Sequence, residues 1–205
     1  MKKWLILFVL LAVSCGGSEK HAAIPKGASV LILGDSLSFG TGANQGEDYP
    51  TLLASNTGWQ IINAGVPGDT SSDGLARLPG LLENHQPKLL LVALGGNDFL
   101  QKLPASQTSS NIRAILAQTK AKNITTVLVA IPEFSPIKAA VGSLTDHPLY
   151  EQIAEETATP LAEEVFSGVL SDNQLKSDQV HPNAAGYQEV RKKMLAELKK
   201  LGFVR

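Results

Sequence analysis

The chain contains one cysteine, Cys15, in 205 residues. A single cysteine cannot form a disulfide within its own chain, so no disulfide framework is available to hold the fold. The net charge of −1 leaves no surplus of basic residues for nucleic-acid binding. Internal repeats, low-complexity tracts and coiled-coil heptads are also missing. The remaining composition, 43% hydrophobic and 18% charged, is that of a globular protein with one large domain.

A run of apolar residues long enough to span a membrane is missing as well. Lys2 and Lys3 precede the apolar residues 4–13, which end at Ser14 and Cys15. This order is typical of a secretory signal, and the run is too short for a stable transmembrane helix. With Cys15 at its end, the segment resembles the lipobox of bacterial lipoproteins, in which the cysteine is lipidated after cleavage. Ala12 stands where that pattern usually has leucine, so a plain secretory signal is the alternative.

These features predict the domain organisation. Residues 1–14 are expected to be a signal peptide, residues 15–27 a lipidated N-terminus and flexible tether, and residues 28–205 the folded domain. A lipid on Cys15 would anchor the domain to a membrane of a bacterial cell envelope, facing the periplasm or the exterior. Without this lipid the protein would be secreted or periplasmic. A monomer is favoured.

Strand and helix patterns alternate along residues 28–205. Strands are predicted at 30–33, 59–62, 88–94, 125–131 and briefly at Leu161; helices are predicted at 49–54, 75–83, 109–120, 148–157 and 184–201. Segments 30–33, 88–94 and 125–131 read as buried strands, which indicates that both faces of their sheet are covered. Alternation of this kind predicts an α/β fold with a parallel sheet and right-handed crossovers.

Small polar turns follow the first three strands. Ser36 ends the turn Gly34-Asp35-Ser36, Gly65 lies in the segment after the second strand, and Asn97 follows Gly95-Gly96 after the third. A further loop before the last helix carries Asp178 and His181. Parallel sheets bind their ligands outside the carboxyl ends of the strands, so these residues are expected to meet at one edge.

The residue types at this edge fit nucleophilic catalysis on a carbonyl group. By itself, Ser36 is more simply interpreted as an ordinary helix cap. With His181 as a base and Asp178 to orient its ring, the Ser36 hydroxyl becomes a nucleophile. The N–H groups of Ser36 and Gly65 and the side-chain amide of Asn97 are the predicted oxyanion donors. Asp35 and Asp98 are expected to be structural.

Four sequence blocks carry a resemblance to a known family. "ILGDSLS", "NAGVPGDTS", "LGGND" and "DQVHPN" resemble, in order and spacing, the signature blocks of the SGNH hydrolases, also called the GDSL family. Within it the chain is most similar to the bacterial thioesterase I, lysophospholipase and arylesterase type. The resemblance implies a flavodoxin-like three-layer α/β/α sandwich with about five strands. It also implies Ser36 as nucleophile, His181 as base, Asp178 as its partner, and Gly65 and Asn97 as oxyanion donors.

The resemblance predicts a serine esterase or thioesterase that forms an acyl-enzyme. Expected substrates are aryl esters, lysophospholipid-like esters and acyl thioesters. A carbohydrate O-acetylesterase acting on envelope glycans and a non-catalytic envelope lipoprotein are the alternatives. No P-loop, dinucleotide-binding or zinc-ligand spacing occurs in the chain, so we expect neither a cofactor nor a metal.

The position of the acyl pocket is a separate prediction. Gly74, Leu75 and Leu78, at the start of the helix that follows the second turn, are expected to border the acyl channel. Segments 133–148 and 161–178 have no close match in the family. The first of these is the alternative wall of the channel.

Overall fold

The structure, a computed structural model, describes residues 21–133 and 135–205. Residues 1–20, with the predicted signal peptide and Cys15, lie outside the described part. Five parallel strands form one sheet in the order β2-β1-β3-β4-β5. They are β1 (Ser29–Gly34), β2 (Gln60–Gly65), β3 (Leu89–Ala93), β4 (Thr125–Val129) and β5 (Leu161–Ala162). No helix of the described residues is long and apolar enough to cross a membrane.

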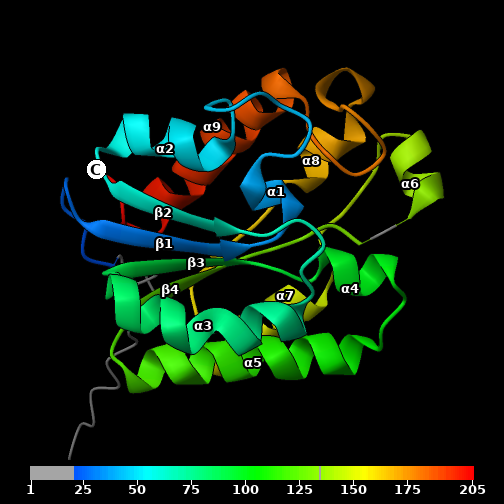
Figure 1. The fold of residues 1–205 in the computed structure, drawn as a ribbon. Coiled ribbons are helices and arrows are strands. Elements are labelled where there is room, and N and C mark those ends of the chain that lie inside the picture. Colours follow the sequence, from blue (N-terminus) through cyan, green and yellow to red (C-terminus); the bar gives the residue numbers. More distant parts are fainter. Residues whose placement is uncertain (1–20, 134) are drawn as a thin grey trace, which may run out of the picture.

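Helices cover both faces of the sheet (Figure 1). One face carries α1 (Ser36–Phe39), α2 (Tyr49–Thr57), α8 (Ser167–Ser171) and α9 (Ala184–Lys200), and the other carries α3 (Ser71–His85), α5 (Ala105–Ala121) and α7 (Leu149–Thr157). Two short helices, α4 (Gly96–Leu100) and α6 (Pro136–Ala140), follow β3 and β4 at the carboxyl edge. A single 3₁₀ turn spans Asn173–Leu175. The predicted three-layer α/β/α sandwich with five parallel strands is confirmed.

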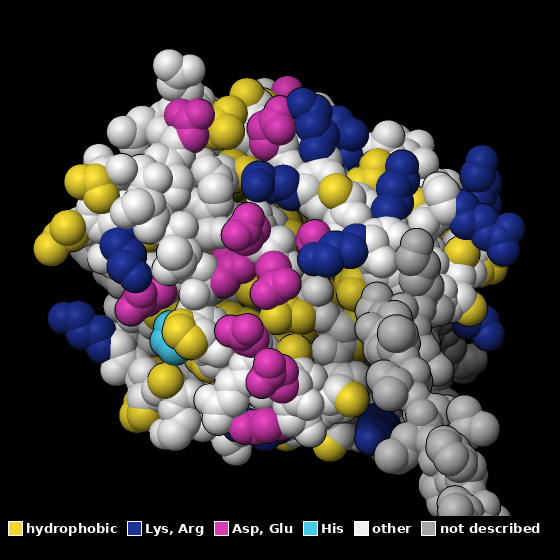
Figure 2. Space-filling model, turned by 180° about the vertical axis from the view of Figure 1, so that it is seen from behind, with side chains coloured by type: hydrophobic (Ala, Val, Ile, Leu, Met, Phe, Trp, Pro, Cys, Tyr) yellow, Lys and Arg dark blue, Asp and Glu magenta, His cyan; other side chains and the backbone are white. Residues whose placement is uncertain are grey.

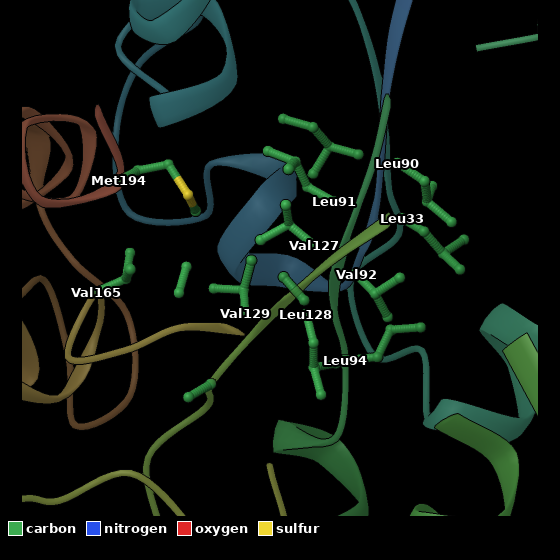
Figure 3. Packing of buried hydrophobic residues seen from close by; sticks show 14 of the residues in the cluster. Leu33, Leu90, Leu91, Val92, Leu94, Val127, Leu128, Val129, Val165 and Met194 are labelled. Carbon is green, nitrogen blue, oxygen red and sulfur yellow. The ribbon is translucent and has the colours of Figure 1, made fainter. Parts of the chain in front are cut away.

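The core is built on both faces of the central strands. All five residues of β3 are buried, as the unbroken apolar run predicts. Figure 3 shows Leu90 and Leu94 on one side of the sheet, and Leu91 and Val127 on the other side together with Met194. Successive side chains of a strand point to opposite faces, so covering both faces requires an apolar residue at every position.

Side-chain caps determine where several helices begin. Asp48 accepts a hydrogen bond from the Thr51 N–H at the start of α2. Thr70 and Asp73 form a reciprocal capping box at the start of α3. Asn183 caps α9 by accepting from the Gly186 N–H. Each cap pairs an N–H group that has no partner within its own helix, so the loops enter these helices at defined residues.

The prediction of a flexible tether is wrong for residues 21–27, which pack on the domain. The His21 N–H donates to the Leu201 carbonyl at 3.0 Å, and the Ile24 N–H donates to the Phe203 carbonyl at 2.9 Å. The rings of His21 and Phe203 stack with centroids 4.7 Å apart. The domain therefore begins several residues earlier than predicted, beside the C-terminal segment.

The topology places a crevice beside β1 and β3. From β1 the chain runs to β2 on one side, and it then crosses back to β3 on the other side of β1. Loops leave these two neighbouring strands in opposite directions, which opens a crevice at their carboxyl ends. Ser36 follows β1 and Asn97 follows β3, so both residues flank this crevice.

Candidate active site

The turn after β1 leaves the Ser36 hydroxyl free for chemistry. Asp35, not Ser36, is the N-cap of α1, and its Oδ1 accepts a hydrogen bond from the Leu37 N–H at 2.9 Å. Asp35 therefore performs the capping role that was the alternative interpretation of Ser36. Ser36 is the first helical residue, with its backbone N–H at the positive end of this short turn.

His181 approaches Ser36 from the loop before α9. Its Nε2 lies 2.9 Å from Ser36 Oγ, across 145 positions of sequence. The His181 side chain is only 18% exposed, so the imidazole is largely shielded from water while its Nε2 faces the hydroxyl. This is the geometry that a general base needs in order to take the serine proton.

Asp178 holds the other side of the imidazole. Its Oδ2 lies 2.7 Å from His181 Nδ1, and its Oδ1 accepts from the backbone N–H groups of Val180 and His181, both at 2.8 Å. Burial raises the pKa of the Asp178 carboxyl, but hydrogen bonds from the His181 ring and these N–H groups outweigh it, so the net pKa is lowered. The ionised carboxylate thus favours a proton on Nδ1, which leaves Nε2 as the acceptor.

Asn97 lines the same cavity as Ser36 and His181. Its Nδ2 donates one hydrogen bond to the Asp69 carbonyl at 2.9 Å. The distance from Nδ2 to Asp35 Oδ2 is 3.5 Å, at the outer limit for a hydrogen bond. The second amide hydrogen is thus held only weakly.

The structure argues against Gly65 as an oxyanion donor. The Gly65 N–H already donates to Asn63 Oδ1 at 3.0 Å. Gly65 is also absent from the walls of the cavity at Ser36. A Cβ atom at Gly65 would overlap the backbone of α1, including the Phe39 nitrogen. Glycine is thus required there for close packing of β2 against α1.

Gly68 is a further candidate for an oxyanion donor, which the sequence did not predict. It lines the cavity with Ser36 and Asn97, and its N–H has no hydrogen-bond partner among the described residues. Its φ of +88° is left-handed, and a Cβ atom there would meet nothing within 4 Å. The segment "NAGVPGDT" contains two glycines, and only their positions in the fold distinguish them.

A guanidinium group joins the loops that carry Ser36 and Gly68. Arg77 Nε donates to Asp69 Oδ2 at 2.7 Å, and its Nη2 donates to the carbonyl of Gly34 at 2.9 Å. Arg77 therefore links the end of β1 to the loop after β2, and the Asp69 carbonyl accepts from Asn97. Arginine suits this position because its planar fork donates in two directions at once.

Buried Asp98 braces the turn beside Asn97, as predicted. Its Oδ2 accepts from the Ser71 N–H at 2.8 Å, and its Oδ1 accepts from the Thr108 hydroxyl at 3.0 Å. These contacts tie α4 to the start of α3 and to α5. The amide of Asn97 is thereby fixed relative to the loop that holds Gly68.

Asp35 is 2% exposed, and burial raises its pKa to about 7, although the Leu37 N–H opposes this shift. Its pKa is thus above the unfolded value of 3.8. Between these values the unfolded chain loses the Asp35 proton while the folded protein keeps it. The stability of the folded state therefore falls as pH rises to about 7.

The Asp35→Asn variant tests this shift. Asparagine keeps an acceptor for the Leu37 N–H but does not titrate, so this loss of stability disappears. Relative to wild type, the variant should gain about 3 kcal/mol in unfolding free energy between pH 4.5 and pH 7.5. Urea unfolding of both proteins at the two pH values measures the gain. An equal difference at both pH values would contradict the raised pKa.

An apolar cavity of about 420 Å³ opens beside Ser36 and His181. Its reactive end contains Ser36, Asn97 and His181, and its apolar wall is formed by Leu100, Ile131, Ala139, Ala140, Leu144 and Leu170. Most of this wall comes from segments 133–148 and 161–178, which have no close match in the signature blocks. The shape of the cavity therefore depends on these two segments more than on the signature blocks at the carboxyl edge of the sheet.

The prediction that Gly74, Leu75 and Leu78 border the channel is wrong, because none of them lines this cavity. Leu78 is fully buried in the core, and Leu75 packs against the same cluster. A Cβ atom at Gly74 would overlap the side chain of Leu94. These three residues dock α3 on the sheet.

Among residues 21–133 and 135–205, no group of three or more His, Cys, Asp or Glu side chains is arranged to hold a metal ion.

Comparison with known proteins gives the family. Residues 32–189 match the model of the GDSL-like lipase/acylhydrolase family. The chain belongs to this family. It is 39% identical over 166 residues to "Thioesterase 1/protease 1/lysophospholipase L1" of Escherichia coli strain K12, covering 76% of each chain. It is 30% identical over 184 residues to an "Arylesterase" of Vibrio mimicus, covering 87% of each chain.

Solved structures agree with this assignment. The psychrotrophic esterase EstA from Pseudoalteromonas sp., inhibited by monoethylphosphonate, superposes with a TM-score of 0.73 at 31% identity. The alignment covers 84% of this chain and 97% of EstA. The GDSL-like hydrolase described here is therefore an enzyme that acts on esters, and the resemblance seen in its four sequence blocks is confirmed.

Proposed function

We propose that this hydrolase cleaves acyl esters and thioesters through an acyl-enzyme on Ser36. The observation that carries the proposal is the 2.9 Å approach of His181 Nε2 to Ser36 Oγ at the mouth of an apolar cavity. His181 takes the hydroxyl proton as Oγ attacks the substrate carbonyl. The carbonyl oxygen becomes an oxyanion that the Asn97 amide and the N–H groups of Gly68 and Ser36 stabilise.

The same groups complete the cycle. Protonated His181 gives its proton to the leaving alcohol or thiol as the tetrahedral intermediate collapses to the acyl-enzyme. His181 then takes a proton from water, which attacks the acyl carbonyl, and Ser36 is regenerated as the acid departs. Asp178 stabilises the imidazolium through the 2.7 Å contact with Nδ1 in both halves of the reaction.

The cavity supports single-chain acyl substrates. Its apolar wall fits an alkyl or aryl acyl group, because burial of each CH₂ is favourable by about 0.8 kcal/mol. The names of the relatives point to aryl esters, lysophospholipids and acyl thioesters. An acetyl group would leave most of the wall unfilled, so the cavity does not favour the O-acetylesterase alternative.

Acyl-chain preference tests the location of the pocket. Replacing Ala139, which lines the cavity, with tryptophan should lower kcat/KM for p-nitrophenyl octanoate relative to the butyrate by about tenfold or more. The matched control is Ala76→Trp on the exposed side of α3, the helix that the sequence placed at the channel. It should leave the ratio unchanged. If the octanoate-to-butyrate ratio changed in Ala76→Trp but not in Ala139→Trp, the acyl channel would lie beside α3, as the sequence predicted.

We also propose that the mature protein is lipidated at Cys15 and faces the periplasm or the exterior of a bacterial cell. The support is the order of the N-terminal sequence, with two lysines, an apolar run and then the lone cysteine. The Cys15→Ala variant should move from the detergent phase to the aqueous phase in detergent-phase partitioning, with unchanged kcat. Wild-type protein in the aqueous phase would refute lipidation and favour a plain secretory signal.

A further inference from the structure

The large apolar side chains that are exposed on the described part of the chain all lie at one edge of the sheet. They are Phe39, Val66, Leu100, Ile137 and Val141, with exposures of 57%, 41%, 38%, 79% and 71%. Each lies in the segment that follows β1, β2, β3 or β4. Because the strands are parallel, these segments share the carboxyl edge. We call these five residues the apolar rim.

Members of the rim lie in the same segments as residues of the active-site cavity. Leu100 lines the cavity itself, and Val66 is the neighbour in sequence of the cavity residue Pro67. Phe39 shares the short helix α1 with the cavity residues Ser36 and Leu37. Exposed apolar residues scattered over a surface need no explanation, but five in the segments that form one cavity edge do.

Helix α6 and the residue after it contribute the two most exposed members of the rim. Ile137 and Val141 are four residues apart, so they project from the same side of this turn. Between them, Ala139 and Ala140 line the cavity. This segment therefore contributes apolar side chains to the solvent as well as to the substrate cavity.

Basic side chains accompany the rim. Lys102 follows Leu100 by two residues and forms no ion pair with any described residue. Lys138 lies between Ile137 and Val141, and its ammonium contacts the Glu133 carboxylate at 2.7 Å. Figure 2, viewed from behind, shows apolar side chains at the left, where this edge lies, with Lys or Arg and Asp or Glu side chains among them. Lysines can keep their ammonium groups among phosphates while apolar neighbours reach deeper.

We propose that the apolar rim docks on the surface of aggregated phospholipids, so that an acyl chain passes from the lipid directly into the cavity. The inference rests on the proposed function, because it supplies the substrate of that site. A folded protein bound over the rim would seal the route to Ser36, whereas a lipid surface contacts separate apolar side chains and delivers a substrate between them. The continuity of the rim with the cavity therefore favours a lipid.

A tryptophan placed in the rim reports the docking independently of catalysis. In the full chain, Ile137→Trp should shift its emission to shorter wavelength on addition of phosphatidylcholine vesicles containing phosphatidylglycerol. The matched control is Asn84→Trp, an exposed position of α3 near the opposite edge of the sheet. Both variants share the N-terminal sequence, so membrane binding through that segment affects them alike. A shift confined to Ile137→Trp is expected.

Activity provides the second measurement. The double variant Ile137→Ser, Val141→Ser should hydrolyse micellar lysophosphatidylcholine about tenfold more slowly than wild type, because interfacial binding scales with the apolar area inserted. Its kcat/KM for monomeric p-nitrophenyl butyrate should stay within about twofold, since these side chains are outside the cavity and exposed surface changes have small effects.

Each contrary result has a defined meaning. An unchanged micellar rate in the double variant, or no wavelength shift in Ile137→Trp, would overturn the docking proposal. A wild-type dimer in sedimentation that the double variant converts to a monomer would assign the rim to a second copy of the chain and also overturn it. If the wild-type protein hydrolysed neither substrate, the proposed function would be refuted, and the fluorescence measurement would still test the docking proposal.

Discussion

Replacing Ser36 with alanine is expected to lower kcat by about 10³-fold or more and to leave the fold intact. The Ser36 hydroxyl has one described side-chain partner, His181 Nε2, at 2.9 Å. Its removal deletes the nucleophile, and His181 Nε2, which loses this partner, can bind water in the cavity that it lines. Asp35 remains the cap of α1, so the local turn keeps its hydrogen bond. Esterase assays and thermal unfolding on one preparation measure both effects.

A neighbouring serine supplies the matched control. Ser38 is fully buried in the same short helix and shares a 2.9 Å hydrogen bond with the Tyr49 hydroxyl. Ser38→Ala should lower the unfolding temperature and retain catalysis, the opposite of Ser36→Ala. An activated phosphonate ester should transfer its phosphonyl group to Ser36 Oγ, with loss of its alkoxide or phenoxide leaving group, and so add the phosphonyl mass to the wild type and to Ser38→Ala, but not to Ser36→Ala. Labelling of Ser36→Ala at the same rate would remove Ser36 from the mechanism.

The second large effect is expected at His181. His181→Ala should lower kcat nearly as much as Ser36→Ala, because the hydroxyl then has no base. Asp178→Asn should lower kcat by about 10²-fold or more, but less than His181→Ala. An amide NH₂ facing Nδ1 favours the tautomer that has its proton on Nε2, and this tautomer cannot accept from Ser36. The Asp178 side chain is 52% exposed, so water offsets part of the loss.

Asp172→Asn is the matched control for the carboxylate. Asp172 accepts a backbone hydrogen bond from the Gln174 N–H at 2.8 Å, in the same region of the chain as Asp178. Asp172→Asn therefore removes a carboxylate from a nearby turn and leaves the contacts of the His181 imidazole unchanged. If Asp178→Asn retained as much activity as Asp172→Asn, the carboxylate would have no role beyond its own turn.

The sequence predicted the main elements because each carries a strong local pattern. The apolar runs became β1, β3 and β4, and the helices with helical spacing of apolar residues became α3, α5 and α9. Three short helices, α4, α6 and α8, were missed, and α1 was anticipated only as a helix that begins at Ser36. Each of these four helices has four or five residues, which is too short for an amphipathic period to be visible. Packing and caps at the carboxyl edge determine them instead.

The segment with Gly65 and Gly68 shows what a sequence motif alone leaves undecided. The sequence contains Gly65 and Gly68 three positions apart, and either one supplies an N–H without a Cβ atom. Gly65 ends β2 with its N–H bound to Asn63, whereas Gly68 turns with a positive φ into the wall of the cavity. Only one of the two N–H groups lacks a hydrogen-bond partner among the described residues, and the packing of β2 beside α1 decides which one.

The sequence by itself determined the fold class, the family and the residue types for nucleophilic catalysis, because these depend on local periodicity and on four short blocks. Only the tertiary structure showed that His181 lies beside Ser36, although 145 positions separate them in the sequence. It also showed that Gly68 lines the cavity and that segments 133–148 and 161–178 form most of the apolar wall. Gly74 and Leu78 look equally suited to a channel in the sequence. They are buried because α3 needs that face to pack against the sheet, and no local pattern states which neighbour a helix face will meet.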